Sequence, residues 1–310
     1  MKIVTLTLNP AFDIHCLADG FVPYGESFVE VSSRDAGGKG VNISRALRMA
    51  GTGSLAVVVL GEDNGEEFYK MLVCDGISVY PIYTRGRIRE NITLHEKEKP
   101  ETRISFGGIS AGRELLSDVG RAIGEVGENT VITFTGSIPR GIEAADLLEL
   151  LRAYGEQGAK IVIDSRSVTL SEIIEFKPWL IKPNRDEAEK YTGKSIDTPL
   201  EAARIAADIC KAGVENVMIS LGADGAVLAT PGGAYHCAPP NIDVLSTIGA
   251  GDSSVAGFID GTQRGYCAEA CLCRAVAFGT AACLCEGTKA PRASDVDKIE
   301  KRISVVRLSV

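Results

Sequence analysis

The sequence lacks several features that would assign it to a particular class of protein. No apolar run approaches the thickness of a bilayer, so we expect no membrane-spanning helix. Basic residues are outnumbered, with 33 Lys and Arg against 41 Asp and Glu, and the net charge of −8 argues against a nucleic-acid partner. The first ten residues follow a strand pattern without the layout of a signal peptide, which predicts a cytoplasmic protein.

Disulfide and metal signatures are also missing. The nine cysteines are odd in number, include no Cys-x-x-Cys pair and have no histidine close to their main cluster. That cluster lies in a stretch, residues 267–286, which is apolar nearly all round, as in a buried helix. We therefore expect reduced cysteines that pack as small core residues. Its members are Cys267, Cys271, Cys273, Cys283 and Cys285.

The chain is long enough, at 310 residues, to bury a large core. Short β-rich apolar runs alternate with segments of helical period, without internal repeats or a long linker, and this alternation predicts an α/β fold around a largely parallel sheet. The expected strands are Ile3–Leu8, Leu55–Leu60, Thr130–Phe134, Lys160–Ile163, Trp179–Ile181 and Asn216–Ser220. Helical segments include Val41–Ala50, Ala145–Tyr154 and Leu200–Ala212.

Two regions, 14–35 and 86–107, have extended patterns with no helical phase. In the second region, polar Arg89, Asn91 and Arg103 alternate with apolar neighbours. This alternation predicts a small sheet with one polar and one apolar face, which could cover a ligand or form ordinary hairpins on the main domain. We accordingly divide the chain into a core of residues 1–13, 36–85 and 108–310 and a small sheet of residues 14–35 and 86–107.

Unusual polar residues follow four of the predicted strands. They lie at residues 9–13, at the turn 136–141, at 182–184 with Glu187 beyond, and at the glycines Gly222 and Gly225. Each group alone is typical of a turn. Because ligands bind beyond the carboxyl ends of parallel strands, four such groups at one sheet edge predict a binding site.

Two glycine turns open predicted helices. Residues 37–40 carry Lys39 and lead to Asn42, but they lack both the Walker spacing and the Gly-x-Gly-x-x-Gly spacing of dinucleotide-binding turns. In the second turn, residues 249–251 precede Asp252 and a helix that we expect to end at Gly265. The free amides of such a helix suit a phosphate. Asp252 could then be an N-cap or a general base beside that phosphate.

These two turns, with their order and separation, resemble the paired signatures of the ribokinase-like (PfkB) sugar kinases over residues 2–290. The segments 7–13, 44–47 and 136–139 look most like the branch that acts on sugar phosphates, which includes 1-phosphofructokinases and tagatose-6-phosphate kinases. The resemblance implies a ribokinase-like core with a small β-sheet lid, and a homodimer that forms through the lids.

The resemblance also implies a role for individual residues. Asp252 matches the catalytic base, and Gly249, Ala250 and Gly251 match the anion hole for the transferred phosphoryl group. Asp13, Gly38, Lys39 and Asn42 match the sugar-binding set, and Arg89, Asn91 and Arg103 lie where this branch holds the substrate's own phosphate. Ser137 is a further expected substrate-binding residue. Lys182, Asn184, Ser220, Gly222 and Gly225 match the nucleotide side, and Glu187 matches the residue that organises Mg²⁺ through water.

We therefore expect an enzyme that uses Mg²⁺ and ATP to phosphorylate a ketose phosphate, with fructose 1-phosphate as the favoured substrate. The alternatives are tagatose 6-phosphate, fructose 6-phosphate, a neutral sugar or nucleoside, and a sensor without catalytic activity. Three features depart from the family pattern. They are Arg185-Asp186, the alanine- and cysteine-rich segment 275–285, and Arg140, an extra cation in the turn 136–141.

Overall fold

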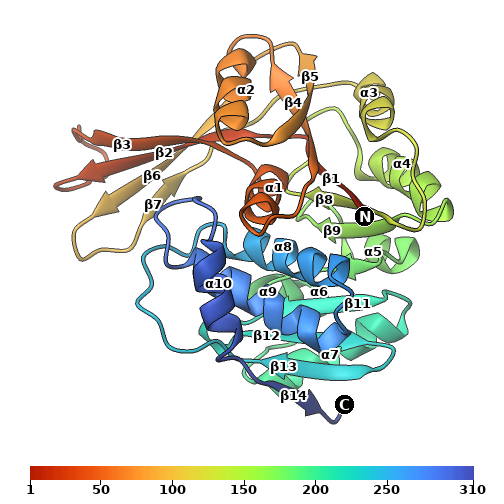
Figure 1. The fold of residues 1–310 in the computed structure, drawn as a ribbon. Helices are drawn as coiled ribbons and strands as arrows, with labels where there is room; N and C mark the ends of the chain where they lie inside the picture. The colour runs from red at the N-terminus through yellow and green to blue at the C-terminus, as the bar shows by residue number, and fades with distance from the viewer.

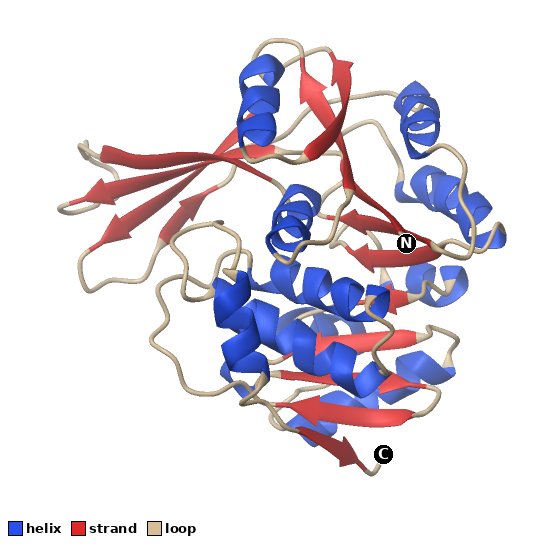
Figure 2. Cartoon of the chain, viewed as in Figure 1, coloured by secondary structure: helices blue, strands red, loops and turns tan.

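The structure is a computed structural model that describes residues 1–310. Its core is a ten-stranded sheet in the order β14-β13-β12-β11-β10-β9-β8-β1-β4-β5. The seven strands from β5 to β11 in this order run parallel, and the last three pair antiparallel at one edge (Figures 1 and 2). The strands are β1 (Lys2–Thr7), β4 (Leu55–Gly61), β5 (Ser78–Thr84), β8 (Thr130–Thr135), β9 (Lys160–Asp164), β10 (Leu180–Ile181), β11 (Asn216–Ser220), β12 (Ala226–Thr230), β13 (Gly233–Cys237) and β14 (Val305–Leu308).

Helices cover both faces of this sheet, as Figure 1 shows. On one face lie α1 (Lys39–Met49), α8 (Ala250–Gln263), α9 (Ala268–Ala282) and α10 (Ala293–Glu300). The opposite face is covered by α2 (Gly65–Cys74), α3 (Glu114–Ile123), α4 (Ala144–Glu156), α5 (Leu170–Phe176), α6 (Arg185–Thr192) and α7 (Pro199–Lys211). None of the helices combines the length and apolar character needed to cross a membrane.

The sequence pattern explains the two layers of core. Alternate residues of one strand point to opposite faces, so Ile132 and Phe134 join the larger cluster of buried residues while Val131 joins the smaller one. The central strands are buried on both sides, which is why they are continuous apolar runs. The predicted mostly parallel α/β architecture is confirmed.

A second sheet of four strands, ordered β3-β2-β6-β7, extends away from the core (Figure 1). Its strands are β2 (Ala11–Ala18), β3 (Glu30–Gly37), β6 (Arg89–Glu96) and β7 (Thr102–Ile104). Thr93 lies opposite Arg103 and Ile92 opposite Ile104, so the polar and apolar faces continue across strands. The strand β2 begins at residue 11 and β3 ends at residue 37, so both extend beyond the predicted segment 14–35. At these ends the strands continue without a break into the core.

All nine cysteines are free thiols. In the C-terminal cluster, Cys271 is buried and Cys267 is exposed at the start of α9, while the other three are half-buried. Cys237 on β13 and Cys273 on α9 face each other with 3.1 Å between their Sγ atoms.

Candidate active site

The second glycine turn brings a carboxylate to the start of α8. Gly249 is the N-cap residue and has φ of 78°, in the left-handed region that favours glycine. Asp252 follows in the first turn and is buried. Its Oδ2 accepts a 2.9 Å hydrogen bond from Nδ2 of Asn42 on α1, although the two residues are 210 positions apart. The two predicted turns therefore form one site.

The surroundings of Asp252 suit a general base. Burial raises its pKa to about 6, against the attraction of Lys39 and the hydrogen bond from Asn42, which both favour the carboxylate. A carboxylate with a pKa near the working pH is both ionised and basic enough to accept a proton. The free amides at the start of α8 lie beside it, where negative charge is stabilised.

A second buried carboxylate, Asp164, lies between two lysines. Its Oδ2 is 3.1 Å from Nζ of Lys39 and 3.6 Å from Nζ of Lys182. Burial raises the pKa of Asp164, but the two ammonium groups outweigh burial and keep the pKa below its ordinary value. The Lys182 ammonium also lies under the turn 249–251, because a Cβ built on Gly251 would be 3.2 Å from its Nζ. Sequence reasoning missed Asp164, although it follows a predicted strand at the same sheet edge.

Asn184 and Glu187 cap α6 reciprocally. Oδ1 of Asn184 accepts a 2.8 Å bond from the Glu187 amide, and Oε2 of Glu187 accepts a 3.0 Å bond from the Asn184 amide. The remaining oxygen, Oε1, accepts a 2.7 Å bond from Nε of Arg166, a partner that the sequence did not suggest. Burial raises the pKa of Glu187, but the bond from Arg166 and the backbone bond outweigh burial and hold the pKa below its ordinary value.

These residues fit a magnesium ion that is held mainly by substrate phosphates. No group of three or more His, Cys, Asp or Glu side chains is arranged to hold a metal by itself. Mg²⁺ keeps several waters and takes one or two carboxylates plus phosphate oxygens, so an all-protein cage is not required. Asp164 and Glu187, with Asp252, are the carboxylates near Lys39. Oδ2 of Asp164 is buried and forms ion pairs with the two lysines but accepts no well-directed hydrogen bond.

Residues of the second sheet meet the first glycine turn. Oδ1 of Asp13 on β2 accepts a 3.1 Å bond from Nδ2 of Asn91 on β6, and its carboxylate lies against Gly37, where a Cβ would collide with it. Burial raises the pKa of Asp13, against Asn91 and the charges of Arg103, His15 and Arg89. The predicted sugar-binding set, Asp13, Gly38, Lys39 and Asn42, is therefore contiguous with the polar face of this sheet.

Arg89 and Ser137 lie where the second sheet joins the core. The Arg89 guanidinium donates to the carbonyl oxygens of Asn9 (3.2 Å) and Phe106 (3.5 Å). Oγ of Ser137 accepts a 2.9 Å bond from Nδ2 of Asn9. Arg103 is exposed on β7, on the same face as Asn91.

The predicted nucleotide-side loop lies beside Asn184. Residues 184 and 220 form an isolated parallel bridge, and the Ser220 amide donates a 3.1 Å bond to the Pro183 carbonyl. A short 3₁₀ turn, η1 (Gly222–Asp224), follows, and Asp224 accepts a 2.6 Å bond from Arg185. Arg185, which departs from the family pattern, thus ties α6 to this turn.

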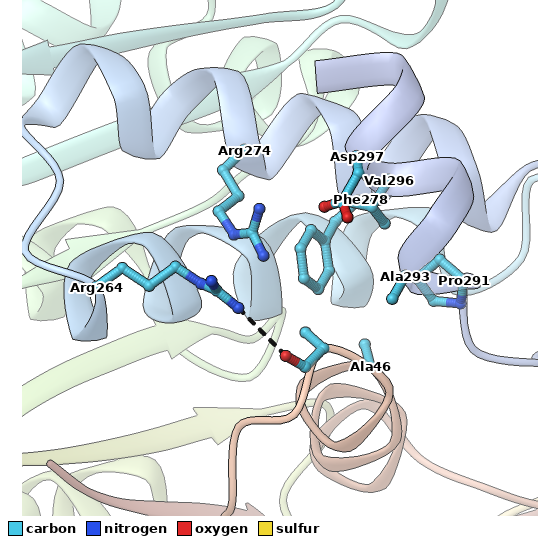
Figure 3. Close-up of a pocket in the computed structure, with 9 residues that line it drawn as sticks. Ala46, Arg264, Arg274, Phe278, Pro291, Ala293, Val296 and Asp297 are labelled. Carbon is cyan, nitrogen blue, oxygen red and sulfur yellow. Dashed lines mark hydrogen bonds between the residues drawn. The ribbon is translucent and has the colours of Figure 1, made fainter. Parts of the chain in front are cut away.

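A separate cavity lies between α1 and α8–α10 (Figure 3). Arg264 and Arg274 line it, and Arg264 donates a 3.2 Å bond to the Ala50 carbonyl at the end of α1. Both guanidinium groups are paired with Asp260, and Arg274 also pairs with Glu300. Their charges are thus neutralised, and the cavity does not include any predicted site residue. We assign this network a structural role.

Comparison with known proteins agrees with this geometry. Residues 17–295 match the pfkB family of carbohydrate kinases. The 1-phosphofructokinase of Escherichia coli K12 is 31% identical over 268 residues, which cover 84% of each chain. ATP-dependent 6-phosphofructokinase isozyme 2 of the same organism is 26% identical and covers 98% of this chain and 99% of its own. The crystal structure of Escherichia coli phosphofructokinase-2 with substrates and products superposes with a TM-score of 0.92 at 26% identity, covering 97% of this chain and 99% of its own.

The chain therefore belongs to the pfkB family of carbohydrate kinases, and its activity is that of a sugar-phosphate kinase. The resemblance seen in the two glycine turns is confirmed at the level of the family and the fold.

Proposed function

We propose that this enzyme transfers the γ-phosphoryl group of ATP to fructose 1-phosphate and forms fructose 1,6-bisphosphate. The observation that carries the proposal is the buried Asp252 at the start of α8, with a pKa of about 6 and a hydrogen bond from Asn42. The 31% identity to a 1-phosphofructokinase favours fructose 1-phosphate as the substrate.

Asp252 acts in this proposal as the general base. Its carboxylate takes the proton of the acceptor hydroxyl while that oxygen bonds to the γ-phosphorus, and the bond to ADP breaks. The amides of Gly249, Ala250 and Gly251 stabilise the charge on the phosphoryl oxygens. Because the transition state needs positioning and charge neutralisation more than covalent assistance, the base and the amides supply part of what the chemical step needs.

The sugar phosphate occupies the space between the first glycine turn and the second sheet. Its hydroxyls are bound by Asp13, Gly38, Lys39 and Asn42, and its phosphate by Arg89, Asn91, Arg103 and Ser137. Neither guanidinium forms an ion pair with a carboxylate, which supports this role, although Arg89 also donates to backbone carbonyl oxygens.

The nucleotide lies along the carboxyl ends of β10 and β11. It would contact Lys182, Asn184, Ser220, Gly222 and Gly225, and Glu187 would help to hold Mg²⁺ there, through water. When bound, Mg²⁺ neutralises negative charge on the phosphates. The lysines on either side of Asp164 hold their ammonium groups toward the same region. A reaction that consumes ATP fits the cytoplasmic location that the sequence predicts.

The second sheet acts as a lid in this proposal, and a second copy of the chain covers its apolar face. The support is the exposure of large apolar side chains on that face, with Val31 59% and Ile104 39% exposed. Sedimentation at micromolar concentration should give a dimer for the wild type and a monomer for Val31→Glu. A wild-type monomer under these conditions would contradict the dimer.

Fructose 6-phosphate is the second candidate substrate, because the solved phosphofructokinase-2 superposes over nearly the whole chain. ADP production should be measured with Mg-ATP and, separately, fructose 1-phosphate, fructose 6-phosphate and tagatose 6-phosphate. Asp252→Asn is the control, since it keeps the side-chain shape without the base. Turnover of fructose 1-phosphate that is lost in the variant supports the proposal, and silence with all three sugar phosphates contradicts it.

A further inference from the structure

Arg140 is a cation whose side chain is not used by the rest of the structure. Its backbone is bound on both sides, since its amide donates to Ile109 (3.2 Å) and its carbonyl accepts from Ala111 (2.9 Å). The side chain, in contrast, forms no ion pair and no hydrogen bond. An exposed guanidinium on a fixed backbone, without a carboxylate partner, is available to an anionic ligand.

The guanidinium of Arg140 lies against the segment that leads from β7 back to the core. A Cβ built on Gly107 would collide with its Nη2. The preceding residue, Phe106, is the one whose carbonyl receives Nη1 of Arg89 at 3.5 Å. Two guanidinium groups from different parts of the fold, the β6 strand and the turn 136–141, thus approach consecutive residues of one short segment.

The same segment offers further polar groups that lack partners. The amides of Gly107 and Gly108 donate to no acceptor in the structure. Gly108 packs on the side chain of Asn9, whose Oδ1 is buried without a donor and whose Nδ2 binds Ser137. Free backbone amides and arginines without carboxylate partners thus lie around the hydroxyl of Ser137. Such groups can bind a phosphate.

We propose that Arg140, with the amides of Gly107 and Gly108, forms a third arm of the site for the substrate's own phosphate and helps to select phosphorylated over neutral sugars. This inference rests on the proposed function, and it adds a residue that neither the glycine turns nor the alternating strand identified. Arg140 binds the phosphate from the core side, whereas Arg89 and Arg103 bind it from the second sheet. A guanidinium suits this position because its planar fork can bind two phosphate oxygens at once.

Steady-state kinetics of Arg140→Ala tests the proposal. We expect the KM for the sugar phosphate to rise about 10- to 100-fold, as for loss of a charge-assisted hydrogen bond, while kcat and the KM for ATP change less than about threefold. Arg140→Lys should recover part of the loss, because it keeps the charge without the fork. Arg152→Ala is the matched control, since Arg152 is another arginine and lies over the ring of Phe176 on the far layer of helices.

Gly107→Ala provides an independent variant. Its added methyl group displaces the Arg140 guanidinium, so it should raise the same KM, and combining it with Arg140→Ala should add little to the effect of Arg140→Ala alone. A KM within about twofold of wild type in Arg140→Ala, or full additivity of the two changes, would overturn the proposal.

Calorimetric titration with inorganic phosphate separates this inference from the proposed function. Phosphate should bind wild type and Arg152→Ala equally, and should bind Arg140→Ala at least about tenfold more weakly. If the wild type turned over no sugar phosphate but this difference remained, the proposed function would fail and the anion site would stand. Equal phosphate affinity in all three proteins would overturn the anion site itself.

Discussion

Asn42 holds the carboxylate of Asp252 through a 2.9 Å hydrogen bond that connects the starts of α1 and α8. The proposed base is therefore oriented by a residue of the proposed sugar-binding turn. Since the bond favours the ionised carboxylate, it also opposes the rise in the pKa of Asp252 that burial causes.

The activity should depend on the protonation of Asp252. Its raised pKa predicts that kcat/KM falls as the pH drops through about 6, because the protonated carboxyl cannot accept the hydroxyl proton. Asn42→Ala should move this acid limb to higher pH, since it removes a bond to the charged form. A pH profile of kcat/KM from pH 5 to 8 measures both, and an acid limb that does not move would contradict the role of Asn42.

Asp164→Asn should lower the stability of the folded protein. The change leaves the nearly buried Lys182 without its only carboxylate within ion-pair distance, and breaking a buried pair costs about 3–5 kcal/mol of unfolding free energy. Urea denaturation measures the loss. Removing the more exposed partner with Lys39→Met should cost less, so an equal or larger loss for Lys39→Met would contradict this ranking.

The network around Asp260 should stabilise the protein without touching substrate. Asp260 is fully buried on α8 and binds Thr52, Arg264 and Arg274, so Asp260→Asn should lower the unfolding free energy by about 3–5 kcal/mol. At temperatures where the variant is folded, its KM values should equal those of wild type. Arg264→Ala is the control and should cost much less, because the Arg264 side chain is 42% exposed.

His15 should make the folded state sensitive to acid. Burial lowers the pKa of His15, the nearby His95 lowers it further, and Asp35, Asp13 and Glu101 oppose them. The unfolded chain then binds more protons than the folded one just below the ordinary value of about 6.5, so stability falls as the pH drops through that range. His15→Gln should flatten this slope in denaturation curves between pH 5 and 7. A slope equal to that of the wild type would contradict the assignment.

The sequence pattern predicted the sheet, the layers of helices and the edge on which the site lies, because these depend on local periodicity. Asp164 could have been found by the same reasoning, since it ends the strand β9 at that edge. The contacts of Asn42 with Asp252 and of Arg166 with Glu187 could not, because they depend on how helices and loops distant in sequence are placed. The Arg140 side chain was visible as an extra cation, but only the structure brings it to Gly107.

The pairing of β2 with β6 has a consequence for the order in which the chain assembles. These two strands run parallel, and the contact of Asp13 with Asn91 joins residues 78 positions apart, with β3, α1, β4, α2 and β5 between them. Closing so long a loop is slow, and the sheet has no helix of its own to form early around it. We expect this sheet to form after the core has docked its first strands, and its backbone amides to exchange with solvent sooner than those of β1 or β8.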